Sequence, residues 1–205
     1  LEAFFGMPRR LRLVFEDGRV SEPYLSRSYL AAERNSGDQK EAAALTILAE
    51  LLGGNATTSV LARKLQFGEP VAVYTSAYYE GDSVDQSTFG LLVVPLPGIG
   101  LDEAEAAMDR VLEEFLAEGV DAGEFERIKT QIRASEIYGR DNTEGLARRY
   151  GQALAIGLTV EDVQAWPEIL QSVTEEDVMA AARRVLDKRS AVTGWLTRPT
   201  EEISE

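Results

Sequence analysis

The chain has 205 residues, of which 44% are hydrophobic and 27% are charged, an ordinary balance for a globular protein with its own core. Its 35 acidic residues outnumber its 21 basic ones, and the formal net charge is -14. This charge disfavours nucleic acid and anionic lipid as partners, because like charges repel at long range. No apolar run approaches the roughly 20 residues needed to cross a bilayer, so we predict no membrane insertion.

The chain contains no cysteine and no histidine. The lack of cysteine excludes thiol nucleophiles, disulfides and thiolate metal sites. The lack of histidine excludes Ser-His-Asp triads and two-histidine zinc sites. Chemistry done by this chain would need paired carboxylates, lysine or tyrosine, and we expect the chain alone to bind no zinc tightly and to cleave no peptide.

Two strands are predicted near the N-terminus. The first ten residues, LEAFFGMPRR, are too short for a signal peptide and are interpreted as an edge cut from a longer chain. Leu11, Leu13 and Phe15 alternate with the residues between them and are followed by a turn at 17–18, which indicates a strand. A second strand is predicted over 24–30 by the same alternation.

A helix is predicted next, and two glycines end it. Asp38 and Glu41 have the spacing of a capping box, and apolar residues recur behind them at helical spacing. Gly53 and Gly54 follow a helix instead of a strand, and no Gly-Lys pair comes after them. The pair is therefore predicted to be a helix end and not a phosphate-binding loop.

The next segments predict a short helix and two strands. The helix begins between Asn55 and Ser59 and ends at 68–70. The strands lie in VAVYTSAYYEG (71–81) and STFGLLVVPLPG (87–98), joined by a polar turn. In the first of these strands Val71, Val73, Thr75 and Ala77 form one face, and Ala72, Tyr74, Ser76 and Tyr78 form the other. We expect the tyrosine-bearing face to point outward, where a phenol can keep its ring dry and its hydroxyl wet.

From residue 101 onward helices follow one another, and a final strand, RSAVTGWL, closes the chain. Strands first, then helices, then one last strand is typical of an α+β fold. We predict a mostly antiparallel β-sheet with several α-helices packed on one face. Arg133, Arg140, Arg148 and Arg149 could hold an anion, but salt bridges on exposed helices are the commoner use of such residues.

The order of these segments resembles a known family. Seven segments, taken in order, together resemble the C-terminal domain of pitrilysin/insulinase-type zinc metallopeptidases. They are the helix ending in Gly-Gly, TTSVLARKL, the Gly-Glu-Pro break, VAVYTSAYY, VVPLPG, EFERIKTQI and the run from NTEGLARRYGQ to AAARRVL. The resemblance is closest to the bacterial two-subunit members related to mitochondrial processing peptidase, and it runs from about Arg10 to Trp195. It implies that residues 1–205 are a single α+β domain, the C-terminal domain of a longer two-domain subunit.

The resemblance also implies that the zinc site and this chain belong to different domains. In that family the zinc lies in the first domain, on an inverted H-x-x-E-H helix whose glutamate is the general base, with a distant glutamate as a further ligand. This chain cannot supply that helix. Zinc is therefore expected in the partner N-terminal domain, and no cofactor is expected in this chain.

Four residues are candidates for contact with substrate or with a partner. The family's non-catalytic half carries an arginine and a tyrosine, seven residues apart, that contact substrate near the scissile bond. Alignment of LQFGEPVAV with that pattern places Gln66 and Val73 at those positions, so both groups are missing. The absence of the arginine and the tyrosine fits the second domain of a metal-bearing subunit. It fits equally a subunit that has lost both the metal site and these substrate contacts. Tyr74 and Tyr78, on the expected outward face, complete the candidate surface.

The resemblance thus implies a non-catalytic domain of a zinc endopeptidase that helps enclose a chamber for unfolded peptide and forms the subunit interface. Its partners would be the N-terminal catalytic domain, a partner subunit of the same peptidase, or both. A bacterial member is expected in the periplasm or the cytoplasm, with the periplasm favoured. The alternative is a scaffold subunit on the same fold, as in the core proteins of respiratory complexes. An H-x-x-E-H motif about one domain upstream in the parent chain, or in an operon neighbour, would decide between them.

Overall fold

The computed structural model describes residues 11–139 and 141–199, so the expectation for the first ten residues lies outside the described part. Its strands form a five-stranded sheet in the order β1-β5-β2-β4-β3. The first and last strands of the chain pair in parallel, and all other neighbours are antiparallel. The strands are β1 (Leu11–Glu16), β2 (Tyr24–Ala31), β3 (Ala72–Tyr79), β4 (Ser87–Pro95) and β5 (Val192–Thr197).

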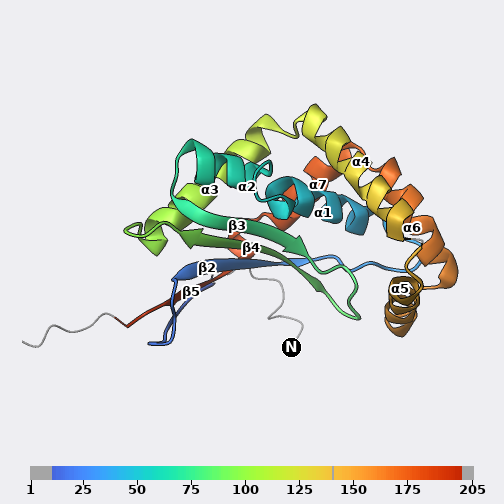
Figure 1. Cartoon of the computed structure of the whole chain (residues 1–205), viewed down its shortest axis with the longest axis horizontal. Helices are drawn as coiled ribbons and strands as arrows, with labels where there is room; N and C mark the ends of the chain where they lie inside the picture. The colour runs from blue at the N-terminus through green and yellow to red at the C-terminus, as the bar shows by residue number, and fades with distance from the viewer. Residues whose placement is uncertain (1–10, 140, 200–205) are drawn as a thin grey trace, which may run out of the picture.

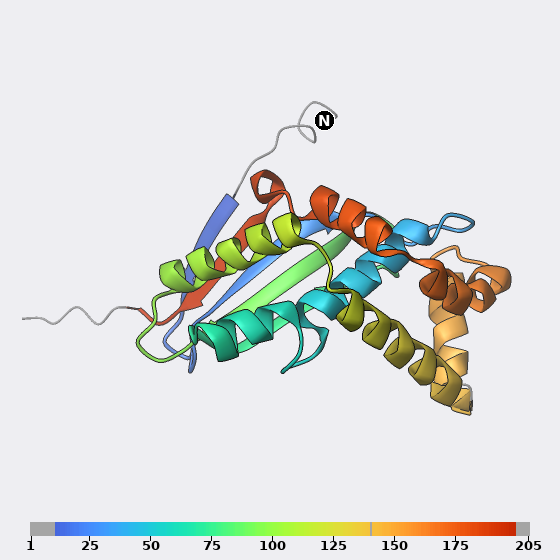
Figure 2. The ribbon, with the colours of Figure 1, turned by 90° about the horizontal axis from the view of Figure 1, so that it is seen from above.

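The helices lie on one face of this sheet, so the predicted α+β fold is confirmed (Figures 1 and 2). Two helices continue directly into π-helical turns, α1 into η2 and α2 into η3. The helical elements are α1 (Lys40–Ala49), η2 (Glu50–Gly54), α2 (Val60–Ala62), η3 (Arg63–Gly68), α3 (Leu101–Glu118), α4 (Ala122–Gly139), α5 (Thr143–Ala155), α6 (Val160–Ser172), α7 (Glu175–Val185) and η4 (Lys188–Ser190).

Alternation along the strands separates a covered face from an open face. On β2, Leu25, Arg27 and Tyr29 are buried beneath the helices, while Leu30 on the other face is 65% exposed. The register continues the covered face through Phe89, Leu91 and Val93 of β4. The sheet is therefore packed on one side only, as antiparallel sheets commonly are.

A charged cluster lies inside the covered layer. The Arg27 side chain is 1% exposed and donates to the Thr193 hydroxyl at 2.9 Å and to Glu105 at 2.7 Å. It also pairs with Asp109 on the same helix, α3. Glu105 in turn accepts from Arg12 at 2.7 Å and from the Trp195 indole at 3.0 Å. These bonds connect three strands to one helix.

The start of α1 differs from the prediction. Its N-cap is Gln39, with no capping bond from a side chain, so the expected Asp38–Glu41 capping box is wrong. The Gln39 side chain is engaged elsewhere, since it accepts from Arg34 at 2.6 Å and donates to Asp162. Capping boxes do form at α6 and α7, with Thr159 and Thr174 as the caps and aspartate as the third helical residue of each.

The glycine pair ends the first helix, as predicted, and Gly53 also allows close packing. A Cβ added to Gly53 would lie 2.0 Å from the backbone nitrogen of Ala77 in β3. Only a residue without a side chain permits this approach of helix to strand. The second helix begins after Ser59 and ends at Gly68, also as predicted, although the Ser59 side chain makes no capping hydrogen bond.

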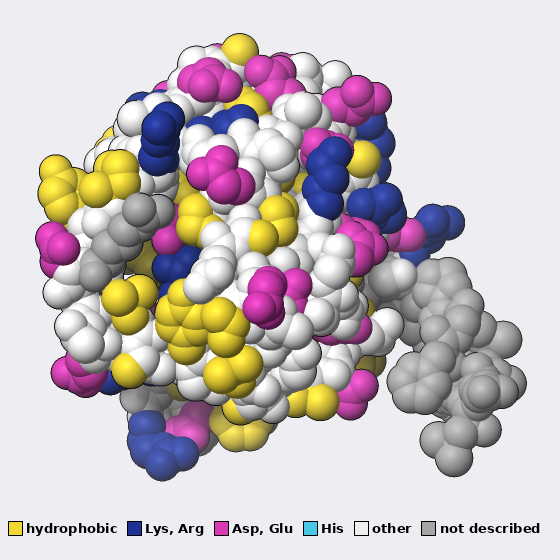
Figure 3. Space-filling view, turned by 90° about the vertical axis from the view of Figure 1, so that its right-hand side faces the viewer, with side chains coloured by type: hydrophobic (Ala, Val, Ile, Leu, Met, Phe, Trp, Pro, Cys, Tyr) yellow, Lys and Arg dark blue, Asp and Glu magenta, His cyan; other side chains and the backbone are white. Residues whose placement is uncertain are grey.

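Helices α4 and α5 lead away from the sheet, whereas α7 returns to pack beside α1 and β2. In α4, Phe125 and Ile128 are buried, but Ile137 is 56% exposed, so the inward face of this helix ends before Ile137. A small separate cluster around Ala153 and Val163 joins α5 to α6. In Figure 3, which looks at this end of the molecule, apolar side chains lie among acidic and basic ones.

Asp162, at the start of α6, binds the turn before α1. Its carboxylate accepts from the Ser36 hydroxyl at 2.6 Å, from the Gly37 amide at 3.0 Å and from the Thr159 amide at 2.8 Å. These bonds favour the ionised form, and they hold the pKa of Asp162 well below its ordinary value, with the Ser36 hydroxyl as the largest cause. Gly37 has a φ of 80°, a left-handed conformation that suits glycine.

The close approach at Gly53 predicts a cost for any side chain there. Gly53→Ala should destabilise the fold by about 1–3 kcal/mol, because the added methyl group meets backbone that cannot move aside cheaply. The measurement is urea unfolding. Gly151→Ala in α5 is the matched control, since nothing lies within 4 Å of its added Cβ, and it should stabilise by about 0.5–1 kcal/mol. Equal effects of both changes would contradict the packing at Gly53.

The lowered pKa of Asp162 predicts that this residue stabilises the fold at neutral pH and not in acid. Its pKa is lowered in the folded state, so the contribution is present above the ordinary aspartate pKa of 3.8 and is lost as pH falls below it. Asp162→Asn should lower the melting temperature at pH 7 and flatten its fall between pH 5 and pH 2. Thermal melts across this range make the measurement, with Asp85→Asn as the control. An unchanged slope for Asp162→Asn would refute the prediction.

Candidate functional site

The open face of the sheet is the surface on which the predicted site residues gather. Tyr74 is 46% exposed and Tyr78 is 39% exposed, and both point away from the helices. Strand register places them beside β4 residues of the same face, Val94 and Gly90. The surface thus combines two phenol groups with half-buried apolar and hydroxyl side chains. The other members on β2, β3 and β4 are Ser26, Ser28, Ser76, Thr88 and Leu92.

A glycine supports Tyr78. A Cβ added to Gly90 would lie 2.1 Å from the Tyr78 ring, so the phenol lies flat across the backbone of the neighbouring strand. Such a ring shields a glycine that would otherwise leave a gap in the sheet surface. The hydroxyl of Tyr78 stays at the open face, where it is available to a ligand or a partner.

The expected alternation along β3 is correct after Tyr74 and wrong before it. Thr75 and Ala77 are buried and Tyr74 and Tyr78 are exposed, as expected. Ala72, placed with the tyrosines by simple alternation, is only 3% exposed, and Val73 is 47% exposed. The cause is a register shift between Ala72 and Tyr74, which reverses the alternation at that point.

Gln66 lies at the outer edge of β3, close to Val73. In the amide orientation that satisfies both of its atoms, Nε2 donates to the Val73 carbonyl at 3.3 Å. Oε1 accepts from the Thr75 amide at 3.1 Å and from the Thr75 hydroxyl at 2.8 Å. The side chain thus bonds to the strand edge as a further strand would. The structure brings Gln66 and Val73 together, whereas Tyr74 and Tyr78 belong to the open face beside them.

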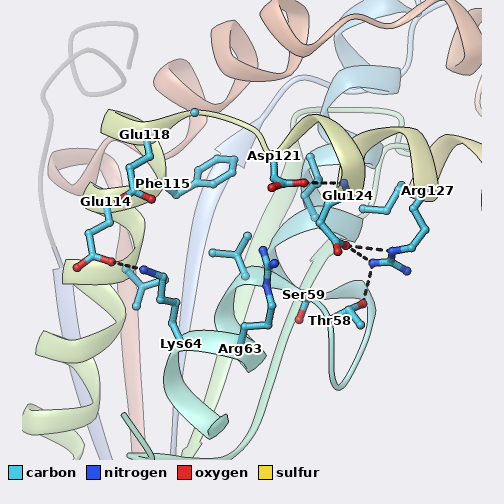
Figure 4. A pocket seen from close by; sticks show the side chains of 15 residues that line it. Thr58, Ser59, Arg63, Lys64, Glu114, Phe115, Glu118, Asp121, Glu124 and Arg127 are labelled. Atoms are coloured by element: carbon cyan, nitrogen blue, oxygen red, sulfur yellow. Dashed lines mark hydrogen bonds and ion pairs between the residues drawn. The ribbon is translucent and has the colours of Figure 1, made fainter. Parts of the chain in front are cut away.

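A second candidate is the cleft between the α2–η3 helix and the junction of α3 with α4, with a volume of about 160 Å³ (Figure 4). Lys64 pairs with Glu114 at 3.0 Å across it. Arg127 pairs with Glu124 and donates to the Thr58 hydroxyl at 2.7 Å. These charges join neighbouring helices, so we assign the cleft a structural role.

The described acidic residues were considered as a metal site. Among the described residues, no three Asp or Glu side chains gather closely enough to hold a metal ion.

No helix of the described part is long and apolar enough to span a membrane.

Surface ion pairs engage two of the four arginines considered as an anion site. Arg148 pairs with Glu144 at 3.2 Å, and Arg149 pairs with Glu136 at 2.7 Å. The prediction that such arginines form salt bridges is therefore confirmed for these two. Arg140 lies outside the described residues.

Sequence reasoning missed the β4 half of the open face. Leu92 and Val94 lie there beside the tyrosines, half-buried. The run of apolar residues in LLVV hides the alternation that separates the two faces of the strand.

Comparison with known proteins identifies the family. The sequence profile described as the peptidase M16 inactive domain matches residues 11–132. The chain therefore belongs to this family, in which it is the inactive domain. A search of the curated proteins gives no match.

Solved structures share the fold at low sequence identity. A protease from Helicobacter pylori superposes with a TM-score of 0.82 at 17% identity, over 91% of this chain and 43% of its own. A peptidase M16 inactive domain from Pseudomonas fluorescens gives 0.69 at 15% identity, over 93% and 43%. A chain of complex III2 from Candida albicans gives 0.72 at 11% identity, over 91% and 45%. The present chain thus spans less than half the length of these relatives.

Proposed function

We propose that this chain is the non-catalytic, C-terminal domain of a zinc-dependent metalloendopeptidase, in which its open sheet face helps enclose the peptide substrate and meets the zinc-bearing half. The observation that carries the proposal is the one-sided sheet of an inactive-domain family member, with Tyr74 and Tyr78 exposed on the uncovered face. Zinc and the catalytic base belong to the N-terminal domain or partner subunit. This chain contributes a contact surface for the substrate and for the zinc-bearing half.

The chemistry of the open face suits an unfolded peptide. An extended peptide presents apolar side chains together with backbone groups that need hydrogen bonds. Tyr74 and Tyr78 offer rings for the former and hydroxyls for the latter. The net charge of -14 would attract cationic segments of such a peptide at long range.

Gln66 and Val73 limit what this domain contributes to the reaction. A carboxamide bonded to Val73 and Thr75 carries no charge to stabilise a developing oxyanion. Val73 has no hydroxyl to donate. The domain therefore positions and encloses the substrate, while bond cleavage depends on groups in the other half.

A scaffold role is the second candidate. The likeness to a chain of complex III2 supports it, since the same fold occurs in a respiratory assembly. A scaffold would use the open face only for contact with a neighbouring subunit, and no peptide would be turned over.

The test uses the complete peptidase, assembled from this chain and the zinc-bearing half. Tyr74→Ala and Tyr78→Ala should each lower kcat/KM for an unfolded peptide by roughly tenfold, or weaken association of the halves by a similar factor, since each truncation removes a partly exposed ring from a contact surface. The melting temperature of this domain should change little.

Tyr138→Ala is the control, because Tyr138 is 79% exposed on α4, away from the sheet. Unchanged turnover and unchanged association in both variants would reject the open face as chamber or interface. Weakened association with no peptide turnover in the unsubstituted assembly would favour the scaffold role.

A further inference from the structure

The two edges of the sheet differ in how they are protected. At β3, Gln66 bonds to Val73 and Thr75, and Gly53 packs against the Ala77 nitrogen. At the opposite margin β1 has no strand on its outer side among the described residues (Figure 2). Edge strands with unpaired backbone groups are templates for pairing with another strand. Only the β1 edge is therefore open to strand addition in the described sheet.

The side chains of β1 are also unusually exposed. All six of its residues are exposed, and four of them are large and apolar. The exposed fractions are 47% for Leu11, 54% for Leu13, 56% for Val14 and 63% for Phe15. Apolar residues occur on both faces of this strand, and its two charged residues, Arg12 and Glu16, lie on one face only. It has neither the proline nor the bulge that protects many edges.

The pairing of β1 with β5 fixes which backbone groups are free. The Leu11 amide donates to the Ala191 carbonyl, and the Asp17 amide donates to the Thr197 carbonyl, both at 3.0 Å. Backbone groups alternate in direction along a strand, so those of Leu13 and Phe15 also point to β5. The amide and carbonyl groups of Arg12, Val14 and Glu16 point outward.

From these observations we infer that β1 is a self-association edge, at which two copies of this chain pair antiparallel about a two-fold axis through Val14. In this register Val14 lies opposite the partner's Val14, and Arg12 lies opposite the partner's Glu16. Each of these opposed residues has outward backbone groups, and such pairs exchange both of their hydrogen bonds. A shift by one residue would place outward groups opposite inward ones and would break the ladder.

The side chains fit the same register. Arg12, whose guanidinium also donates to Glu105 of its own chain at 2.7 Å, and the partner's Glu16 carry opposite charges on the helix-covered side of the sheet. They flank the two Val14 side chains. On the open face, Leu13 lies opposite the partner's Phe15, an aliphatic and aromatic pair at the closer, non-hydrogen-bonded spacing. Charge, apolar contact and backbone direction thus select one arrangement.

The assembly is closed. A two-fold pairing uses the β1 edge of both copies, and the β3 edges that remain are covered by Gln66 and Gly53. An isologous contact of this kind gives a dimer and not a fibre. The inference depends on β1 alone and is independent of the proposed contact between Tyr74, Tyr78 and a peptide.

The first experiment is sedimentation equilibrium of the 205-residue chain over a range of concentrations, with substituted variants. The unsubstituted chain should form a concentration-dependent dimer. Val14→Pro removes an outward amide and none that bonds to β5, so it should weaken the dimer by at least roughly tenfold while the fold is kept. Glu16→Lys should weaken it too, because it places two cations opposite each other.

Leu30→Lys is the control, since Leu30 is 65% exposed on the open face of a central strand and has no place at the edge. It should leave the dimer unchanged. A chain that stays monomeric, or a dimer lost with Leu30→Lys and kept with Val14→Pro, would overturn the inference.

Cysteine cross-linking tests the register directly, because the natural chain has no cysteine. Val14→Cys should oxidise to a covalent dimer, since opposed residues of a hydrogen-bonded pair lie about 5.5 Å apart between Cα atoms, within disulfide range. Leu13→Cys alone should cross-link poorly, since its own counterpart lies on a diagonal of about 7–8 Å. A mixture of Leu13→Cys and Phe15→Cys chains should cross-link well. The reverse order of yields would overturn the register.

Discussion

The buried Arg27 cluster is the interaction on which the arrangement of this protein depends. A guanidinium that is 1% exposed is stable only if its charge and its donors are matched, and Glu105, Asp109 and Thr193 match them. Because these partners come from α3 and β5, the cluster holds the last strand between the first two and fixes the helix across them. Removal of one partner from such a cluster costs about 3–5 kcal/mol, since it leaves a charge buried and uncompensated.

The cluster lies on the covered face of the sheet. Arg27 shares its face with Leu25 and Tyr29, so the helices pack there, and the alternate residues of every strand are left on the other side. The proposed chamber surface with Tyr74 and Tyr78 follows from this one-sided packing, and the proposed association edge follows from the place of β1 at the end of the strand order. The chain belongs to the family of peptidase M16 inactive domains.

Glycine and glutamine residues adapt the scaffold in ways that involve no catalysis. Gly53 brings a helix against β3, and Gly90 receives the Tyr78 ring. Gln66 bonds to a strand edge that would otherwise be free. Gln66 is itself a predicted site residue and Gly90 contacts another, Tyr78, so packing accounts for part of the surroundings of the candidate surface.

The sequence by itself determined the fold class and nearly every helix and strand, because hydrophobic periodicity and helix ends are local properties. The family came from the resemblance of its segments, in their order, to a known family. It also determined that Tyr74 and Tyr78 share a face, since side chains alternate along a strand. Only the tertiary structure decided that Ala72 is buried, because a register shift against β4 reverses the alternation. The burial of Arg27, the parallel pairing of β1 with β5 and the use of the Gln39 side chain away from its helix depend on partners far away in the chain, which no local pattern specifies.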